Sequence, residues 1–271
     1  MSERLQKVLA QTGMGSRRQI EQWIEQGEIR VNGQLATLGT RVDSTDKISV
    51  RGRTVKPNAR KPKLKVIIFN KKEGQICSRK DAEGRESVYH QLPKIQGGRW
   101  ISVGRLDLNT SGLLLFTNDG ELAHRLMHPS NQLEREYACR ILGSVPRAMF
   151  ERLHQGVLLE DGLANFSYIR DAGGQGANHW YHVVIKEGRQ REVRRLWESQ
   201  GVTVSRLIRV RFASVALPPR LPQGKWQFLT KSEIEELCGL VRYHPQQPIY
   251  EPGAGHRKKN RPYNRKRVKK A

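Results

Sequence analysis

Basic residues crowd the two ends of this chain, so most of the material for a hydrophobic core lies in residues 66–240. Lys and Arg outnumber Asp and Glu by 14 to 6 in residues 1–65 and by 10 to 1 in residues 241–271, against 25 to 19 in between. The formal net charge of +23 favours a polyanionic partner, and basic arms around a core are typical of nucleic-acid-binding proteins. A membrane surface is the weaker alternative, because neither a long amphipathic helix nor a lipidation signal accompanies the charge.

The rest of the composition argues against several classes of protein. A length of 271 residues suggests two domains, or one domain with appendages, at ~100–200 residues per domain. No apolar run approaches the ~18 residues that a membrane span needs, and the N-terminus lacks the apolar segment of a secretory signal. Three cysteines stand far apart without a Cys-x-x-Cys pair, which argues against a disulfide framework and a zinc site. We therefore expect a cytoplasmic protein without a metal.

Two helices and a small hairpin-rich segment are predicted near the N-terminus. Apolar residues recur at helical spacing in two places: Leu5, Val8 and Leu9, then Ile20, Trp23 and Ile24. Ser16 and Gln19 fit a capping box that begins the second helix. Short strands are expected at 29–31 and 48–50, with an Asn32-Gly33 turn after the first.

Arg17 and Arg18 lie in the first turn of the second helix, off its apolar stripe. Positive charge there opposes the helix dipole, so contact with phosphates explains the pair better than a local structural benefit. A solvated arginine pair is the alternative. Leu5, the Gly-x-Ser-Arg-Arg segment and Val31-Asn32-Gly33 resemble the pattern of the S4 RNA-binding domain. That resemblance implies an S4-like module over residues 1–60.

An α+β domain is predicted for residues 66–240, preceded by a linker at 61–65. Strands are expected at 66–69, 100–103, 113–117, 137–142, 168–170, 181–185 and 207–212, and helices at 121–128, 146–155, 189–200 and 232–241. Because these elements alternate irregularly, a mixed, largely antiparallel sheet with flanking helices is favoured over a repeated βαβ fold. Residues 241–271 are expected to form a basic, disordered tail.

The segment 104–120, GRLDLNTSGLLLFTNDG, places a polar loop between two apolar strands. Asp107 is the one acidic residue in that loop. It is therefore expected to be held rigidly at the edge of a sheet. Asp is also common in turns, where it caps the backbone, and the pattern alone favours that simpler role.

The residues Gly104, Arg105, Leu106, Asp107, Thr110, Gly112, Leu113 and Leu114 resemble the signature of the RsuA-type pseudouridine synthases. Three further segments resemble motifs of that family: EREYACR (134–140), EGRQREVRRLWE (187–198) and RLIRVRF (206–212). The resemblance implies that Asp107 is the catalytic carboxylate, that Tyr137 packs on the target base, and that Leu207 lines the pocket.

The third motif falls on the helix expected at 189–200, whose buried face is Val193, Leu196 and Trp197. Arg194 at the border of that face is expected to reach inward and pair with Asp107, which keeps the carboxylate ionised. Arg105, Arg191 and Arg195 are expected to contact RNA. A solvated basic face is the alternative for part of this cluster.

The family resemblance implies isomerisation of a specific uridine in ribosomal RNA, a reaction without a redox step and hence without a cofactor. LMHPS (126–130), VSRLIRVRF (204–212) and the basic tail together resemble the members of this family that act on large-subunit RNA. That resemblance implies a 23S target in a stem-loop near the peptidyl transferase centre, in pre-ribosomal particles. The protein is expected to be a monomer. Two alternatives stay open: a sister enzyme acting on 16S RNA or another 23S uridine, and a non-catalytic S4-type rRNA-binding assembly factor.

Overall fold

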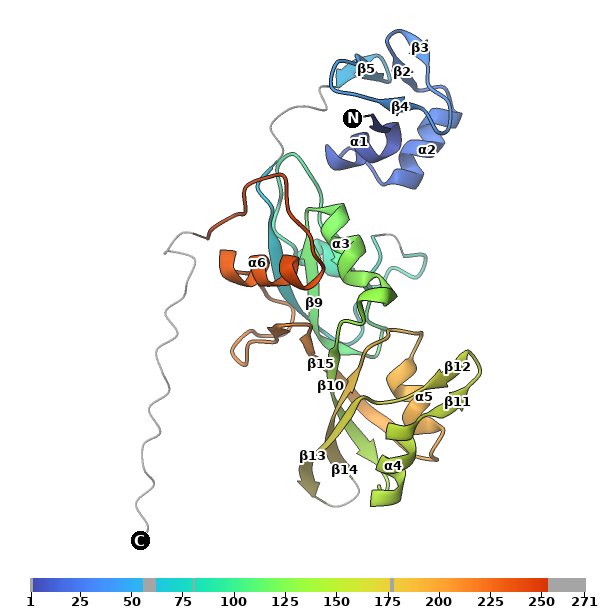
Figure 1. Cartoon of the computed structure of the whole chain (residues 1–271), viewed down its shortest axis with the longest axis vertical. Coiled ribbons are helices and arrows are strands. Elements are labelled where there is room, and N and C mark those ends of the chain that lie inside the picture. Colours follow the sequence, from blue (N-terminus) through green and yellow to red (C-terminus); the bar gives the residue numbers. More distant parts are fainter. Residues whose placement is uncertain (1, 56–61, 80, 176–177, 253–271) are drawn as a thin grey trace.

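The computed structural model describes residues 2–55, 62–79, 81–175 and 178–252 (Figure 1). Residue 61 of the linker predicted at 61–65 and residues 253–271 of the predicted tail lie outside these ranges. No helix in the described ranges is long and apolar enough to cross a bilayer. Within the same ranges, no three His, Cys, Asp or Glu side chains gather in a group that could hold a metal ion.

The N-terminal module consists of two helices packed on short strands. Its elements are β1 (Glu3–Arg4), α1 (Leu5–Gln11), α2 (Arg17–Glu25), β2 (Ile29–Val31), β3 (Gln34–Leu35), β4 (Arg41–Val42), β5 (Ile48–Val50) and β6 (Arg53–Val55). The Ser16 side chain accepts a hydrogen bond from the backbone N–H of Gln19, as the capping signal predicts. Leu5, Leu9 and Ile20 are fully buried, so the helical spacing identified the core of the module correctly.

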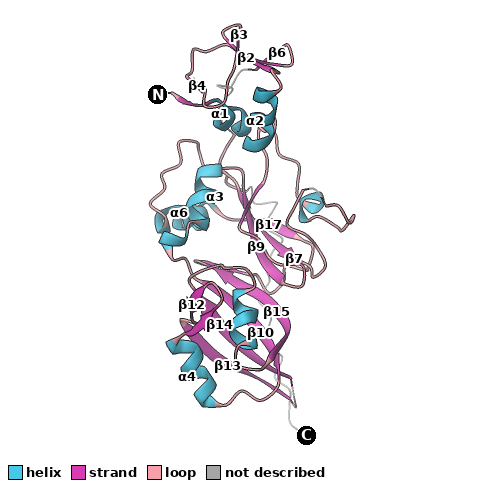
Figure 2. Ribbon diagram, turned by 90° about the vertical axis from the view of Figure 1, so that its right-hand side faces the viewer, coloured by secondary structure: helices cyan, strands magenta, loops and turns pink. Residues whose placement is uncertain are grey.

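One large sheet organises the second domain, with strand order β13-β14-β10-β15-β9-β7-β17 (Figure 2). Along this order neighbouring strands are antiparallel except β15 and β9, which are parallel. The sheet is thus mixed and largely antiparallel, as predicted. Its strands are β7 (Val66–Lys71), β9 (Ser111–Thr117), β10 (Arg135–Leu142), β13 (Tyr168–Gln175), β14 (Asn178–Ile185), β15 (Thr203–Phe212) and β17 (Trp226–Phe228), with β8 (Ile101–Val103) beside β9 and β16 (Val215–Ala216) beside β15.

Helices and a small hairpin cover the sheet. They are α3 (Gly120–Met127), α4 (Arg147–Gln155), α5 (Glu192–Glu198), α6 (Lys231–Leu240), and the hairpin of β11 (Val157–Leu159) and β12 (Gly162–Ala164), with 3₁₀ turns at Val88–Gln91 and Pro129–Asn131. One apolar cluster includes residues of α4 and α5, and a second includes residues of α3 and α6. Helix α5 is shorter than the predicted 189–200, because Arg191 takes a left-handed conformation (φ 51°) that stops a helix.

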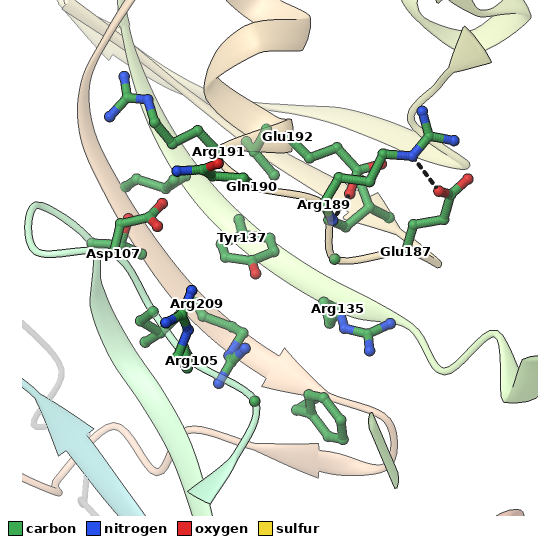
Figure 3. A pocket seen from close by; sticks show the side chains of 18 of the residues that line it. Arg105, Asp107, Arg135, Tyr137, Glu187, Arg189, Gln190, Arg191, Glu192 and Arg209 are labelled. Carbon is green, nitrogen blue, oxygen red and sulfur yellow. Dashed lines mark hydrogen bonds and ion pairs between the residues drawn. The ribbon is translucent and has the colours of Figure 1, made fainter. Parts of the chain in front are cut away.

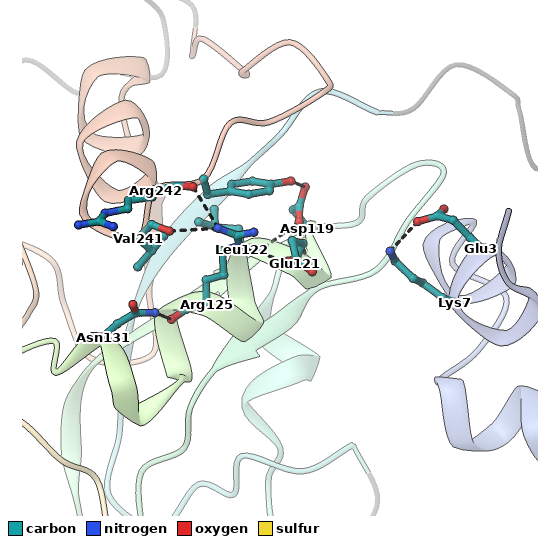
Figure 4. Close-up of polar contacts among 10 residues, drawn as sticks. Glu3, Lys7, Asp119, Glu121, Leu122, Arg125, Asn131, Val241 and Arg242 are labelled. Atoms are coloured by element: carbon teal, nitrogen blue, oxygen red, sulfur yellow. Dashed lines mark hydrogen bonds and ion pairs between the residues drawn. The ribbon is translucent and has the colours of Figure 1, made fainter. Parts of the chain in front are cut away.

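The chain after α6 folds back on α3, so the predicted tail boundary at residue 240 is wrong. Arg125 of α3 donates hydrogen bonds to the carbonyl oxygens of Val241 and Arg242 at 3.3 and 3.0 Å (Figure 4). The Tyr243 hydroxyl donates to the carboxylate of Asp119 at 2.7 Å. These contacts extend the folded domain past α6.

The end of the predicted linker also belongs to the folded domain. Leu64 is fully buried in the cluster under α3 and α6, and it forms a β-bridge with Ile249. In the sequence, Leu64 stands alone among prolines and lysines, so no apolar periodicity indicated that it is buried. The domain therefore begins near residue 64 instead of 66.

Candidate active site

A cavity of about 610 Å³ opens where the loop before β9 meets β10, β15 and the start of α5 (Figure 3). Five of the residues predicted to act on RNA line it: Arg105, Asp107, Tyr137, Arg191 and Leu207. Segments up to a hundred residues apart in the chain therefore converge on one pocket, and the sheet order brings them together.

The loop that carries Asp107 is held in place by hydrogen bonds from a buried lysine. Lys71, at the end of β7, is fully buried, and its Nζ donates hydrogen bonds to the carbonyl oxygens of Asp107, Leu108 and Thr110 at 3.0, 3.3 and 2.8 Å. Burial lowers the pKa of Lys71, and the carbonyls offset the loss of water. Lys71 was not predicted to be a site residue. Its only signal was its position directly after an apolar strand.

The following turn adds two further contacts to the same loop. The backbone N–H of Gly74 donates to the carbonyl of Leu108 at 2.8 Å. The backbone N–H of Leu106 donates to the Cys77 sulfur at 3.5 Å. The Asp107 loop is therefore fixed on both sides of the carboxylate, as required of a residue that acts on a bound substrate.

Gly112 permits the close approach of β9 and β15 beneath the pocket. Its φ is +100°, and a Cβ on it would lie 2.3 Å from the carbonyl oxygen of Arg209. No other residue fits that backbone conformation and that space. Gly112 thereby sets the distance between the Asp107 loop and the pocket-lining strand.

Asp107 differs from the two glutamates that line the pocket in its side-chain contacts. Its side chain forms no hydrogen bond or ion pair with any described residue. By contrast, Glu187 pairs with Arg189 at 2.6 Å, and Glu192 accepts the backbone N–H of Arg189 at 3.0 Å. Burial raises the pKa of Glu192. The Glu187 carboxylate is thus taken up by an ion pair, and burial disfavours the charged form of Glu192. Of the three carboxylates that line the pocket, Asp107 alone has no such contact among the described residues.

Tyr137 and Leu207 form the wall opposite the carboxylate. Tyr137 lies in the middle of β10 and is 8% exposed, and Leu207 in β15 is 4% exposed. Both side chains are therefore anchored in the core and reach the pocket with one surface. A flat aromatic surface next to an apolar wall suits a planar base removed from its stack.

Arg194 lies behind the Asp107 loop and does not form the predicted ion pair. Its Nη1 donates to the carbonyl of Val204 at 2.7 Å and its Nη2 to the carbonyl of Asn109 at 2.8 Å, and no ion pair joins it to Asp107 among the described residues. Burial and the charge of Arg191 lower the pKa of Arg194, whereas the charge of Asp107 raises it. Arg194 therefore acts on the carboxylate through the loop backbone and at longer range. The helical wheel placed it at the border of α5, but it is 5% exposed.

Arg194→Met is expected to lower the rate of the reaction by about a hundredfold and the free energy of unfolding by about 2 kcal/mol, because two buried carbonyls lose their donor. Arg195→Met is the matched control on the same helix, with an expected loss below about 1 kcal/mol. Single-turnover kinetics and thermal unfolding of the two variants measure both effects. Equal losses in the two variants would contradict a specific role for Arg194.

The other predicted arginines fall in three different places. Arg105 is exposed at the mouth of the pocket, and Arg191 lines it while holding Glu198 at 3.4 Å. Arg195 is turned away from the pocket and forms a bidentate ion pair with Asp161 at 2.9 and 2.8 Å, which ties α5 to the β11–β12 hairpin. Arg17 and Arg18 are exposed on α2 of the N-terminal module.

Three arginines that line the pocket were not predicted from the sequence: Arg135, Arg189 and Arg209. Arg135 begins β10 and Arg209 lies in β15, and both are at least nine-tenths buried. A signal for Arg209 was present, because residues two apart in a strand share a face, and Arg209 is two residues after the pocket residue Leu207. Arg135 has the same spacing signal, because it lies two residues before the pocket residue Tyr137, but it precedes the strand predicted at 137–142.

The fold and the site define an RNA-modifying enzyme built from a small RNA-binding module and a catalytic domain whose pocket holds the Asp107 carboxylate. Residues 65–199 match the RNA pseudouridylate synthase family and residues 3–48 match the S4 domain. The chain belongs to the pseudouridine synthase family.

Named relatives agree over almost the whole chain. It is 55% identical to "Ribosomal large subunit pseudouridine synthase B" of Pseudomonas aeruginosa over 90% of this chain and 64% of that protein. It is 53% identical to the protein of the same name from Salmonella typhimurium, over 91% of this chain and 86% of that protein. A solved pseudouridylate synthase structure covers 86% of this chain and 99% of its own, with a TM-score of 0.60 and 27% identity.

Proposed function

We propose that this protein isomerises a specific uridine to pseudouridine in the 23S RNA of the large ribosomal subunit. The observation that carries the proposal is the unpaired Asp107 carboxylate beside Tyr137, in a pocket lined by arginines. The names of the relatives that share half of its residues support the choice of RNA.

The chemistry requires one carboxylate and no other reactant. The bond between C1′ of the ribose and N1 of uracil breaks, the base turns, and a bond forms between C1′ and C5. Asp107 serves as nucleophile, at the sugar or at the base ring, and its bond to the substrate breaks again before the product leaves. A base removes the proton from C5 and N1 gains a proton, so the product is an isomer of the substrate. Tyr137 holds the detached uracil by stacking, and Arg194 steadies the loop that carries the carboxylate. Atoms and charge balance without a cofactor.

Two other functions are weighed against this one. A sister enzyme acting on 16S RNA or another 23S uridine would need the same catalytic residues, and the names of the relatives favour the large subunit. A non-catalytic assembly factor would have no need of a free Asp107 facing Tyr137. The intact pocket therefore favours an enzyme.

Mapping pseudouridines in the ribosomal RNA of a strain that lacks the gene tests the proposal. One 23S position is expected to lose its modification and to regain it when the wild-type gene is returned. A missing modification in 16S RNA would instead identify a sister enzyme, and an unchanged map would favour the assembly factor.

The N-terminal module is expected to position the RNA without taking part in the chemistry. The double variant Arg17→Glu, Arg18→Glu should weaken binding to the target RNA by about tenfold or more, since two phosphate contacts become repulsive. The rate at saturating RNA should change little. Filter binding and single-turnover kinetics separate the two quantities, and Arg17→Lys, Arg18→Lys is the charge-preserving control. A large fall in the saturated rate with unchanged binding would contradict this role.

The setting of the reaction completes the proposal. The protein acts in the cytoplasm as a monomer, on pre-ribosomal particles. Three cysteines without disulfide bonds are compatible with a reducing compartment. The nine basic residues in 256–271, which lie outside the described ranges, add phosphate contacts that are independent of sequence.

A further inference from the structure

The pocket extends past Asp107 and Tyr137 into a second, strongly basic part. Arg135, Arg209 and Phe212 line this part, which we call the basic subsite (Figure 3). The guanidinium groups of Arg135 and Arg209 lie 5.3 and 5.5 Å from the centre of the Phe212 ring. Two like charges are thus brought together over one ring, an arrangement that needs compensation.

The hydrogen bonds of these two arginines differ. Arg135 is occupied, because its Nη1 donates to the carbonyls of Leu133 and Lys186 at 2.6 and 3.0 Å. Arg209 is fixed by its Nε, which donates to the carbonyl of Leu113 at 2.7 Å, whereas its Nη2 is buried and has no partner among the described residues. A buried donor without an acceptor is destabilising, and such groups in a native pocket call for a ligand.

No carboxylate neutralises the basic subsite. Among the described residues, neither Arg135 nor Arg209 forms an ion pair. Glu192, whose charge acts on Arg135, is engaged by the backbone of Arg189, and burial raises the pKa of Glu192. Burial and the charge of Arg209 lower the pKa of Arg135, against the opposing effects of Tyr137 and Glu192. The missing partner is therefore an anion.

We propose that the basic subsite binds the phosphodiester next to the target uridine, with Arg209 Nη2 as the donor that positions the nucleotide. This inference rests on the proposed function and adds a positioning residue to it. Phosphodiesters are the only anions of an RNA, whereas the oxygens of uracil are neutral acceptors. Arg209 is also paired directly with Tyr137 across β15 and β10. A phosphate held by Arg209 would therefore adjoin a base stacked on Tyr137.

Stem-loop substrates with a neutral methylphosphonate at a single linkage test the proposal. One substrate carries it directly beside the target uridine, on either side, and a control substrate carries it four nucleotides away. With the wild-type protein, the neutral linkage beside the uridine should weaken binding by about tenfold or more, as expected for a lost charge-assisted hydrogen bond. The distant linkage should have little effect. This comparison needs no variant, so misfolding cannot obscure it.

Arg209→Gln completes a cycle with the same substrates. The variant should bind the normal stem-loop about as weakly as the wild type binds the neutral one, and neutralising the adjacent linkage should then cause no further loss. Arg209→Lys should recover part of the affinity, because it retains the charge. Additive losses, or equal wild-type affinity for all substrates, would overturn the proposal. The proposal would also be overturned if Arg209→Gln removed the sensitivity of binding to a uracil analogue that lacks one carbonyl oxygen, and left the sensitivity to the neutral linkage unchanged.

The cycle also separates this inference from the proposed function. Turnover of the unmodified stem-loop by the wild type tests whether the protein is the synthase for that site. Filter binding tests the phosphate contact whether or not turnover occurs. Turnover without dependence on the adjacent phosphate would overturn the basic subsite alone, and a phosphate dependence without turnover would overturn the assigned target alone.

Discussion

Asp107→Asn is expected to lower the rate of pseudouridine formation by several orders of magnitude, in the range seen when a covalent catalyst is removed. The substitution keeps the size of the side chain and removes its charge and nucleophilicity. The loop should remain in place, since Lys71 and Arg194 hold it through backbone carbonyls that the substitution does not touch. RNA affinity should stay similar or rise slightly, because one negative charge near the phosphates is lost. Tritium release from a labelled stem-loop measures the rate, and filter binding measures the affinity.

The same variant separates catalysis from a structural role for Asp107. Asn replaces Asp well in turns and caps, so a turn-capping Asp107 would leave turnover near the wild-type value. The Asp107 carboxylate accepts no hydrogen bond from a described residue, which already argues against a cap. Asp119→Asn offers a contrast, because Asp119 does cap α3 through the N–H groups of Glu121 and Leu122. Its effect should fall on stability.

Lys71→Met is expected to damage both the site and the fold. The substitution fits the volume of the lysine stem but leaves three carbonyls of the Asp107 loop without their buried donor. At about 1–3 kcal/mol per unsatisfied group, partly relieved by movement of the loop, we expect a loss of about 3 kcal/mol in the free energy of unfolding. That corresponds to a melting temperature lower by roughly 6–12 °C for a domain of this size. The rate should fall at least a hundredfold, because the carboxylate loses its fixed position.

Lys72→Met is the matched control for this prediction. Lys72 is the next residue and is exposed, so its replacement removes the same charge from the same turn without touching the loop. Differential scanning calorimetry and single-turnover kinetics of the two variants measure stability and rate. Similar behaviour of the two would show that the charge, and not the buried hydrogen bonds, matters.

Local patterns were enough to predict the four helices of the second domain and most of its long strands, but not the short strands β11, β12, β16 and β17. The spacing of Leu5, Leu9 and Ile20 identified the core of the N-terminal module, because helical periodicity shows directly which face is buried. Asp107 and Tyr137 came from motifs whose resemblance to a family is carried by short contiguous segments, and the structure brings both to the same pocket. These features depend on residues that are close together in the chain, so they can be predicted from the sequence.

The partners of the buried charges depended on the tertiary structure. Lys71, Arg194 and Arg209 can be buried because carbonyl oxygens from distant segments accept their hydrogen bonds. The residues next to them in the chain do not indicate where those acceptors are. From the sequence alone, such a charged residue is therefore assigned to the end of a strand or the edge of a helix. Its burial becomes evident only when the order of the strands is known. The parallel pairing of β9 with β15 and the return of the chain after α6 have the same origin, since periodicity shows that a face is buried and not which segment covers it.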